Sequence, residues 1–151
     1  MTAGRSLWRS RSCDLAGAIG GHEDAAETWQ EVQARLALAV DAVFWDPDKD
    51  AYVDSIHRDG TRSALTSQAT NAMICRYGLA DSARCDFLHQ RFDKRDSALL
   101  KYGSSAGLYY VLEFLDFMGD SVTILRFVRK SWGDMLHAGD RTVWESLPKL
   151  D

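Results

Sequence analysis

The segment 131–145 holds the residues whose types and spacing are best suited to chemistry. An apolar helical pattern runs through Trp132, breaks at glycines and ends on Trp144 and Glu145. Loops that follow rigid helices often carry functional side chains, and a carboxylate is the group that hydrolysis of a glycosidic bond requires. Glu145, with an indole directly before it, is therefore the leading candidate for a functional group.

Simpler interpretations apply to the same segment. A single glutamate is usually a solvated surface carboxylate, and periodicity by itself predicts helices and no chemistry. Trp132 lies in a helical apolar stripe, so we expect it to pack in the core. We expect His137 to be a solvated residue at a helix end, in preference to a ligand.

The overall composition predicts a globular chain with one domain. It has 151 residues, of which 46% are apolar and 26% are charged, which is enough to bury a core. The net charge of −4 gives no basic surface, so we expect neither nucleic-acid binding nor attraction to an anionic membrane. Nothing approaches the ~20 apolar residues of a membrane span.

Neither the cysteines nor the Asp-rich stretch 46–50 has the spacing of a metal site. Cys13, Cys75 and Cys85 lack metal-binding spacing, and their odd number argues against a disulfide framework. Cys75 lies in an apolar helical pattern and is expected to be a buried, inert thiol, which fits a reducing, cytoplasmic location.

A calcium loop counted from Asp46 would need glycine at its sixth position and glutamate at its twelfth, and the chain has Ala51 and His57 there. The stretch is therefore interpreted as a solvated turn. We expect no metal site.

Apolar spacing predicts a series of helices joined by short turns. The expected helical segments are 13–19, 23–44, 65–77, from 81 or 82 to about 92, 105–118, and one that follows the turn at 119–120. The segment 23–44 carries one apolar stripe, made of Ala25, Trp29, Val32, Leu36, Val40 and Val43 or Phe44. The stripe of the last segment is Val122, Leu125, Val128, Trp132 and Met135.

Paired in sequence, these segments form three consecutive αα-hairpins, so the predicted fold is all-α with at most a small extended segment at 51–56. The segment 105–118 is apolar nearly all round and should be buried on several sides. Residues 1–12 are small, basic and Ser-rich, and we expect a disordered or frayed tail followed by one domain over 13–151.

Two stretches of the chain resemble the six-hairpin domain of bacterial α-L-rhamnosidases, which are glycoside hydrolases of family 78. The first comprises Asp14-Leu15-Ala16, Gly20, Phe44-Trp45-Asp46, Tyr52-Val53-Asp54, Ser67-Gln68-Ala69 and Gly78-Leu79. The second comprises Ser104-Ser105, Tyr109, Leu112-Glu113-Phe114-Leu115, Gly119, Trp132-Gly133-Asp134-Met135-Leu136, Gly139 and Thr142-Val143-Trp144-Glu145. The order and spacing match over roughly positions 13 to 147, and the second stretch is the more specific.

The resemblance implies that the chain forms about half, the C-terminal half, of an (α/α)6 toroid that hydrolyses terminal α-L-rhamnosyl bonds with inversion. Inversion needs a general acid at the leaving oxygen and a general base that activates water on the opposite face of the sugar. The resemblance places the base on Glu145 and sugar-binding roles on Trp144, Thr142 and Arg141. The family has a small residue and a second threonine in place of Asp140 and Arg141, which leaves the sugar specificity open.

The resemblance also implies that the general acid is missing, because the family's acid lies in the first half of the barrel. Glu113 and Asp116 lie inside an apolar segment and are expected to be structural. The expected function is a fragment of an inverting glycoside hydrolase that carries the base, is inactive alone and needs no cofactor. The alternative is a non-catalytic helical module that binds carbohydrate or assembles with the missing half-barrel or a second copy of itself.

Overall fold

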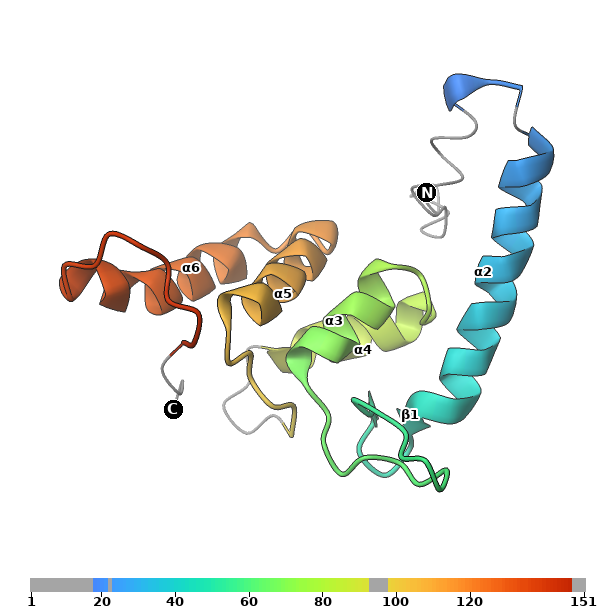
Figure 1. Ribbon diagram of the computed structural model, residues 1–151, viewed down its shortest axis with the longest axis horizontal. Helices are drawn as coiled ribbons and strands as arrows, with labels where there is room; N and C mark the ends of the chain where they lie inside the picture. Colours follow the sequence, from blue (N-terminus) through green and yellow to red (C-terminus); the bar gives the residue numbers. More distant parts are fainter. Residues whose placement is uncertain (1–17, 22, 93–97, 148–151) are drawn as a thin grey trace.

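The computed structural model describes residues 18–21, 23–92 and 98–147. The helices in this part of the chain are α2 (Glu23–Phe44), α3 (Gln68–Arg76), α4 (Ser82–Phe92), α5 (Ser105–Phe117) and α6 (Ser121–His137) (Figure 1). A small antiparallel pair, β1 (Trp45–Asp46) and β2 (Ala51–Tyr52), follows α2. The all-α prediction is confirmed. None of the described helices has both the length and the apolar character to cross a membrane.

The helix boundaries agree closely with the predicted segments. The helix predicted at 23–44 is α2, whereas α3 begins at Gln68 instead of residue 65. The later start has a local cause, because the Ser67 hydroxyl accepts a hydrogen bond from the Thr70 backbone N–H at 3.2 Å and so caps the helix. The predicted tail at 1–12 and most of the helix predicted at 13–19 lie outside the described residues.

Helices α3 and α5 run side by side in the same direction. At their starts, Ser67 pairs with Leu100 in a parallel bridge. Toward their far ends, the Tyr77 hydroxyl donates to the Glu113 carboxylate at 3.3 Å, which agrees with a structural role for Glu113. Because α4 and α6 follow after short turns and run back, the described chain forms two αα-hairpins, α3–α4 and α5–α6 (Figure 1).

The core lies among α3, α4 and α5. Phe92 of α4 packs against Phe114 of α5 with ring centroids 5.1 Å apart, and Leu108 and Leu115 of α5 are fully buried. The Gln68 side-chain amide donates to the Phe92 carbonyl at 2.8 Å and joins the start of α3 to the end of α4. The buried residues of α5 lie along one side and Tyr109 is 55% exposed, so the expectation that this segment is buried on several sides is met only in part.

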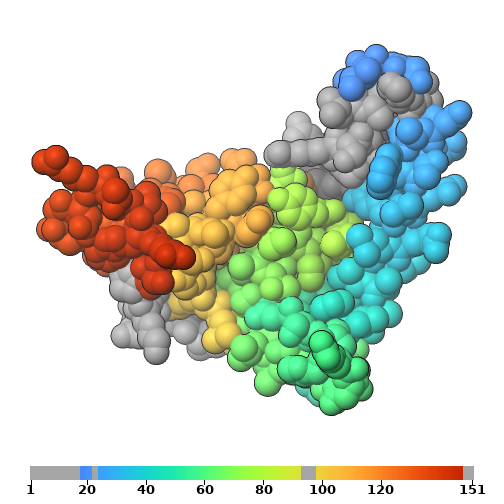
Figure 2. All heavy atoms as spheres, in the orientation of Figure 1, coloured from blue at the N-terminus to red at the C-terminus, as the bar shows by residue number. Residues whose placement is uncertain are grey.

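The apolar stripe of α2 is mostly exposed. Stripes of this kind usually face a core, but Trp29 is 55% exposed and Leu36 is 49% exposed. Val40 and Phe44, near the end of the helix, do pack against the core. The N-terminal part of α2 therefore extends away from the α3–α4 hairpin (Figures 1 and 2).

The stripe of α6 is divided between the core and the surface. Met135 is buried and Trp132 is partly buried against the core, so the expected core packing of Trp132 is confirmed. The Trp132 indole N–H is buried with no hydrogen-bond partner among the described residues. At the other end of the same stripe, Val122 is 77% exposed and Leu125 is 55% exposed.

Candidate functional site

Three connecting segments are linked to one another by isolated bridges around the starts of α3 and α5. They are 45–67, 98–104 and 138–147, the last of which we call the C-terminal loop. The parallel bridge of Ser67 and Leu100 joins the first two segments, and an antiparallel bridge of Ser104 and Ser146 joins the second to the C-terminal loop. Glu145 is therefore placed at the end of the molecule where the helices α3 and α5 start.

The C-terminal loop is anchored on both sides of Glu145. The Ser105 hydroxyl, in the first turn of α5, donates to the Trp144 carbonyl at 2.8 Å. The Leu147 backbone N–H donates to the Gly103 carbonyl at 3.0 Å, and the Leu147 side chain is buried. The backbone on either side of Glu145 is thus held against the start of α5.

The start of the C-terminal loop is set by a helix-ending glycine. Gly139 has a φ of +78°, which a residue without Cβ adopts most easily, and the following Asp140 N–H donates to the Met135 carbonyl at 3.1 Å. The Asp140 carboxylate accepts a hydrogen bond from the Trp144 indole N–H at 2.6 Å. Asp140 therefore orients Trp144, the predicted sugar-binding tryptophan.

The predicted site residues lie close together along this loop. Glu145, Thr142 and Arg141 are exposed, and Trp144 is half-buried. The Glu145 carboxylate makes no hydrogen bond to another described residue, so it is free to bind water or a ligand. The catalytic role of Glu145 and the sugar-binding roles of Trp144, Thr142 and Arg141 stay predictions. His137 is exposed at the end of α6, as expected.

A second polar cluster, to which nothing in the sequence pattern pointed, lies where α2 meets α4. The Arg84 guanidinium forms an ion pair with Asp41, donates to the Tyr52 hydroxyl at 3.3 Å, and lies 4.2 Å from the centroid of the Trp45 ring. The Tyr52 hydroxyl donates to Asp41 at 2.9 Å, and burial raises the pKa of Tyr52, which keeps the phenol protonated. Because Arg84 lies far from these partners in sequence, spacing could not reveal the cluster.

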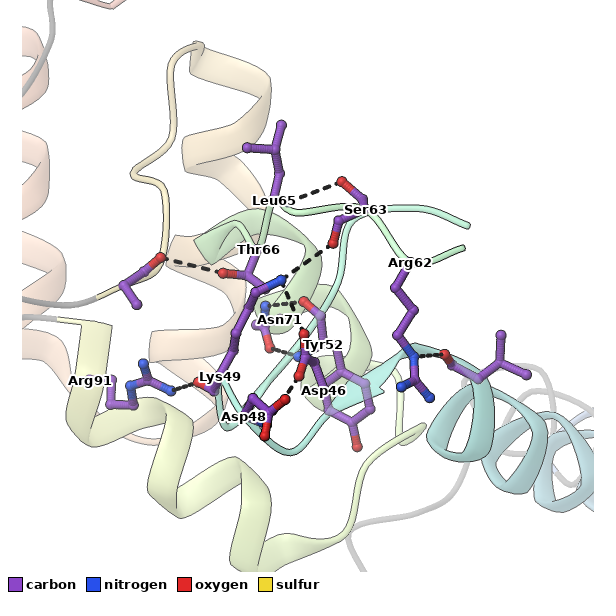
Figure 3. A network of polar contacts seen from close by, with 12 residues as sticks. Asp46, Asp48, Lys49, Tyr52, Arg62, Ser63, Leu65, Thr66, Asn71 and Arg91 are labelled. Carbon is purple, nitrogen blue, oxygen red and sulfur yellow. Dashed lines mark hydrogen bonds and ion pairs between the residues drawn. The ribbon is translucent and has the colours of Figure 1, made fainter. Parts of the chain in front are cut away.

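The first connecting segment is fixed by buried and local polar contacts (Figure 3). The fully buried Asn71 side chain accepts from the Tyr52 N–H at 2.9 Å and donates to the Tyr52 carbonyl at 3.0 Å. Lys49 pairs with Asp46 at 3.0 Å, and its hydrogen bond is the main cause that lowers the pKa of Asp46. The Asp-rich stretch is a turn, as interpreted, and the described residues contain no group of three or more His, Cys, Asp or Glu arranged to hold a metal ion.

The thiols of the described residues are buried. Cys75 is 1% exposed and Cys85 is 3% exposed, which confirms the expected burial of Cys75. A hydrogen bond with Cys85, followed by burial, raises the pKa of the Cys75 thiol, which disfavours the thiolate form that acts as a nucleophile. Cys13 lies outside the described residues.

A groove of about 590 Å³ lies between α2 and the turn that joins α3 to α4. Leu38 of α2, Leu79 and Asp81 are among its lining residues, and Glu145 is not. The groove and the C-terminal loop are therefore separate features.

Among solved structures, the chain is similar to a rhamnosidase of glycoside hydrolase family 78 from Bacillus sp. GL1, with a TM-score of 0.76 and 31% sequence identity. The fold is like that of a family 78 rhamnosidase domain. The match covers 89% of this chain and 14% of that chain, so the chain spans a small part of the length of that enzyme. No protein-family model and no curated protein sequence matches the chain.

Proposed function

We propose that the chain is a piece of an inverting glycoside hydrolase resembling the α-L-rhamnosidases, in which Glu145 is the general base. The observation that carries the proposal is the similarity to a rhamnosidase over 89% of the chain at 31% identity. The substrate class that follows is a carbohydrate with a terminal rhamnosyl group. An inverting reaction then needs Glu145 to remove a proton from the attacking water.

The surroundings of Glu145 support this assignment. A general base must hold its carboxylate in a defined place yet keep an oxygen open to water. The carboxylate of Glu145 is exposed, and hydrogen bonds at Trp144 and Leu147 hold the backbone on both sides of it. Positioning of this kind is what keeps a catalytic group within reach of its substrate.

The neighbouring residues suit contacts with a sugar. The Trp144 ring is half-buried and its indole N–H is bonded to Asp140, so the ring is held in one orientation in which it can pack against the apolar side of a sugar. Thr142 and Arg141 are exposed next to it and supply hydroxyl and guanidinium groups for sugar hydroxyls.

In this proposal the general acid comes from outside the chain. Inverting enzymes hold their two carboxyl groups about 6.5–9.5 Å apart, with the sugar and a water between them. The chain corresponds to 14% of the length of the similar rhamnosidase, which leaves most of that enzyme's fold to supply the opposite carboxyl group. Alone, the chain is then expected to be inactive.

Hydrolysis of an aryl α-L-rhamnoside tests both halves of the proposal. The purified chain should release no aryl alcohol, and ordinary enzyme rates would show that the missing-acid proposal is wrong. In the Bacillus rhamnosidase, glutamine at the position that aligns with Glu145 should lower kcat by about 10²–10⁴-fold or more while the fold is retained. Unchanged turnover would remove the base assignment.

A second candidate function is a non-catalytic helical module that binds carbohydrate or assembles with another chain. The observation that favours it is the exposure of apolar side chains on α2 and α6. Rhamnose binding by the isolated chain, with no hydrolysis even when a complementary half-barrel is added, would support the binding module over the hydrolase fragment.

A further inference from the structure

The Asp140 carboxylate, at the start of the C-terminal loop, uses only one of its two oxygens within the described part of the chain. Oδ2 accepts the hydrogen bond from the Trp144 indole N–H at 2.6 Å. Oδ1 makes no hydrogen bond to another described residue, and the side chain is exposed. Because a carboxylate accepts several hydrogen bonds, Oδ1 is left with the capacity to bind a donor from a ligand.

The neighbouring Arg141 does not pair with this carboxylate. Among the described residues, no ion pair joins Asp140 to a cation. The partner of Asp140 is instead a neutral indole. Hydrogen bonds to a carboxylate are roughly twice as strong as those between neutral groups, which favours the binding of a hydroxyl donor at Oδ1.

The backbone holds both partners of this hydrogen bond in place. The Asp140 N–H donates to the Met135 carbonyl at 3.1 Å, directly after the left-handed Gly139. The Trp144 N–H lies 3.5 Å from the Met135 sulfur, and the Trp144 carbonyl accepts from the Ser105 hydroxyl at 2.8 Å. The carboxylate and the indole are therefore arranged before a ligand binds, which lowers the entropy that binding costs.

The bond to Trp144 also determines where the carboxylate lies relative to the indole. An indole N–H points outward in the plane of its ring, so the acceptor of that N–H lies at the ring edge. A sugar that packs its apolar side against the ring directs its hydroxyls outward, toward such an edge. An aromatic face with a carboxylate at its edge therefore suits a ligand that has one apolar side and hydroxyl donors around its rim.

We propose that Asp140 and Trp144 form one sugar-recognition unit. In this unit Asp140 Oδ2 positions the indole, and Oδ1 accepts a hydrogen bond from a hydroxyl of the sugar that packs on the indole. The choice of a sugar as the ligand rests on the proposed function, whereas the positioning of the indole rests on the contacts alone. Asp140 thereby becomes a residue that binds the sugar, in addition to Trp144, Thr142 and Arg141.

Hydrogen exchange of the Trp144 indole proton, followed by ¹⁵N NMR on the full chain, tests the positioning role. The signal is assigned by its loss in Trp144→Phe. Asp140→Ala removes the acceptor and should speed exchange by about tenfold or more, whereas Asp140→Asn keeps an amide oxygen as acceptor and should retain most of the protection. Asp134→Ala, which removes an exposed carboxylate of α6, is the matched control and should change nothing. Unchanged exchange in Asp140→Ala would overturn the positioning role.

Titration of the same chain with L-rhamnose, followed at the Trp144 indole signal or at the sugar signals, tests the contact with the sugar. Asp140→Ala should raise the dissociation constant about tenfold or more, and Asp134→Ala should leave it unchanged. The decisive variant adds Asp140→Ala to Trp144→Phe, which keeps an aromatic face but has no N–H. A further loss of affinity of about threefold or more is expected there, because the hydroxyl contact at Oδ1 is independent of the indole N–H.

Equal affinities of Trp144→Phe with and without Asp140→Ala would overturn the hydroxyl contact. A chain that does not bind rhamnose at all would overturn the recognition unit as a whole. Circular dichroism checks that each variant keeps its helices. Neither exchange nor binding depends on bond cleavage, so failure of the base assignment in the hydrolysis assays and failure of this proposal are separate results.

Discussion

The two stretches that resemble the rhamnosidases have opposite characters in the structure. In the first, Tyr52 is fully buried, and its backbone is hydrogen-bonded to the buried side chain of Asn71, which lies between the matching residues Ala69 and Gly78. In the C-terminal loop, the backbone is anchored but Glu145 is exposed with its carboxylate open. The resemblance therefore covers two kinds of residue: buried residues that build the fold and, in the C-terminal loop, an exposed carboxylate.

The contrast extends to the ends of the helices. Asp54 accepts hydrogen bonds from both the backbone N–H and the hydroxyl of Ser67, at 2.9 Å and 2.8 Å, and so fixes the start of α3. The corresponding polar group of the C-terminal loop, the Asp140 carboxylate, binds the Trp144 indole. One carboxylate organises a helix, and the other orients a side chain of the candidate site.

The largest expected effect is at Tyr52. Tyr52→Ala removes a fully buried aromatic ring that contacts Trp45 edge-on at 5.0 Å, and should lower the free energy of unfolding by about 3–5 kcal/mol. Tyr52→Phe is the matched control, because it keeps the ring and loses the hydrogen bonds to Asp41 and Arg84. Urea denaturation measures both, and equal losses would show that the hydroxyl, and not the ring, carries the effect.

A smaller loss is expected at Asn71. Asn71→Ala leaves the buried backbone N–H and carbonyl of Tyr52 without their partners, which should cost about 2–4 kcal/mol in unfolding free energy. The same urea series measures it. A loss of unfolding free energy below about 0.5 kcal/mol, which is typical of an exposed substitution, would mean that this hydrogen-bonded pair does not stabilise the fold.

The Asp46–Lys49 pair predicts a modest dependence of stability on pH. The folded pKa of Asp46 is below its usual value of 3.8, so the carboxylate stabilises the fold above about pH 4 and this contribution is lost as the pH falls through the folded pKa. Asp46→Asn should therefore lower the stability of the fold at neutral pH. The stability of the variant should also fall less steeply as the pH is lowered. Thermal unfolding from pH 2 to pH 7 measures this, and an unchanged acid decline would contradict it.

The smallest expected effect on stability is at Glu145. Because its exposed carboxylate has no hydrogen-bond partner among the described residues, Glu145→Gln should change the free energy of unfolding by less than about 0.5 kcal/mol. Urea denaturation checks this value. A loss as large as that expected for Asn71→Ala would make Glu145 a structural residue and remove the contrast between the two stretches.

Local pattern predicted much of the fold. Apolar spacing located α2 and α5, and glycines marked helix ends such as the one at Gly139. The exposure of Trp29 and Leu36 could not be predicted, because an apolar stripe shows that a helix can bury one side but not whether the partner is present. The Ser67 cap at the start of α3 is local, but the contacts that hold Ser67 in place, with Leu100 and Asp54, join distant residues and no local pattern contains them.

The candidate site, too, has features that the sequence predicts and features that depend on contacts between distant residues. Glu145 and Trp144 could be selected from the motif, because they are adjacent in sequence. Their anchoring depends on Ser105, which is distant in sequence, and the Arg84 cluster joins residues from separate elements. Sequence spacing therefore identified residue types for chemistry, and packing determined where they lie.

The most direct test of the account is a chimera in which this chain replaces the matching segment of the Bacillus rhamnosidase, which then supplies the rest of the fold. If Glu145 is the general base, the folded chimera hydrolyses an aryl α-L-rhamnoside, and Glu145→Gln lowers kcat by about 10²–10⁴-fold or more without a change in thermal stability. A chimera that hydrolyses the substrate equally well with glutamine at this position would contradict the account.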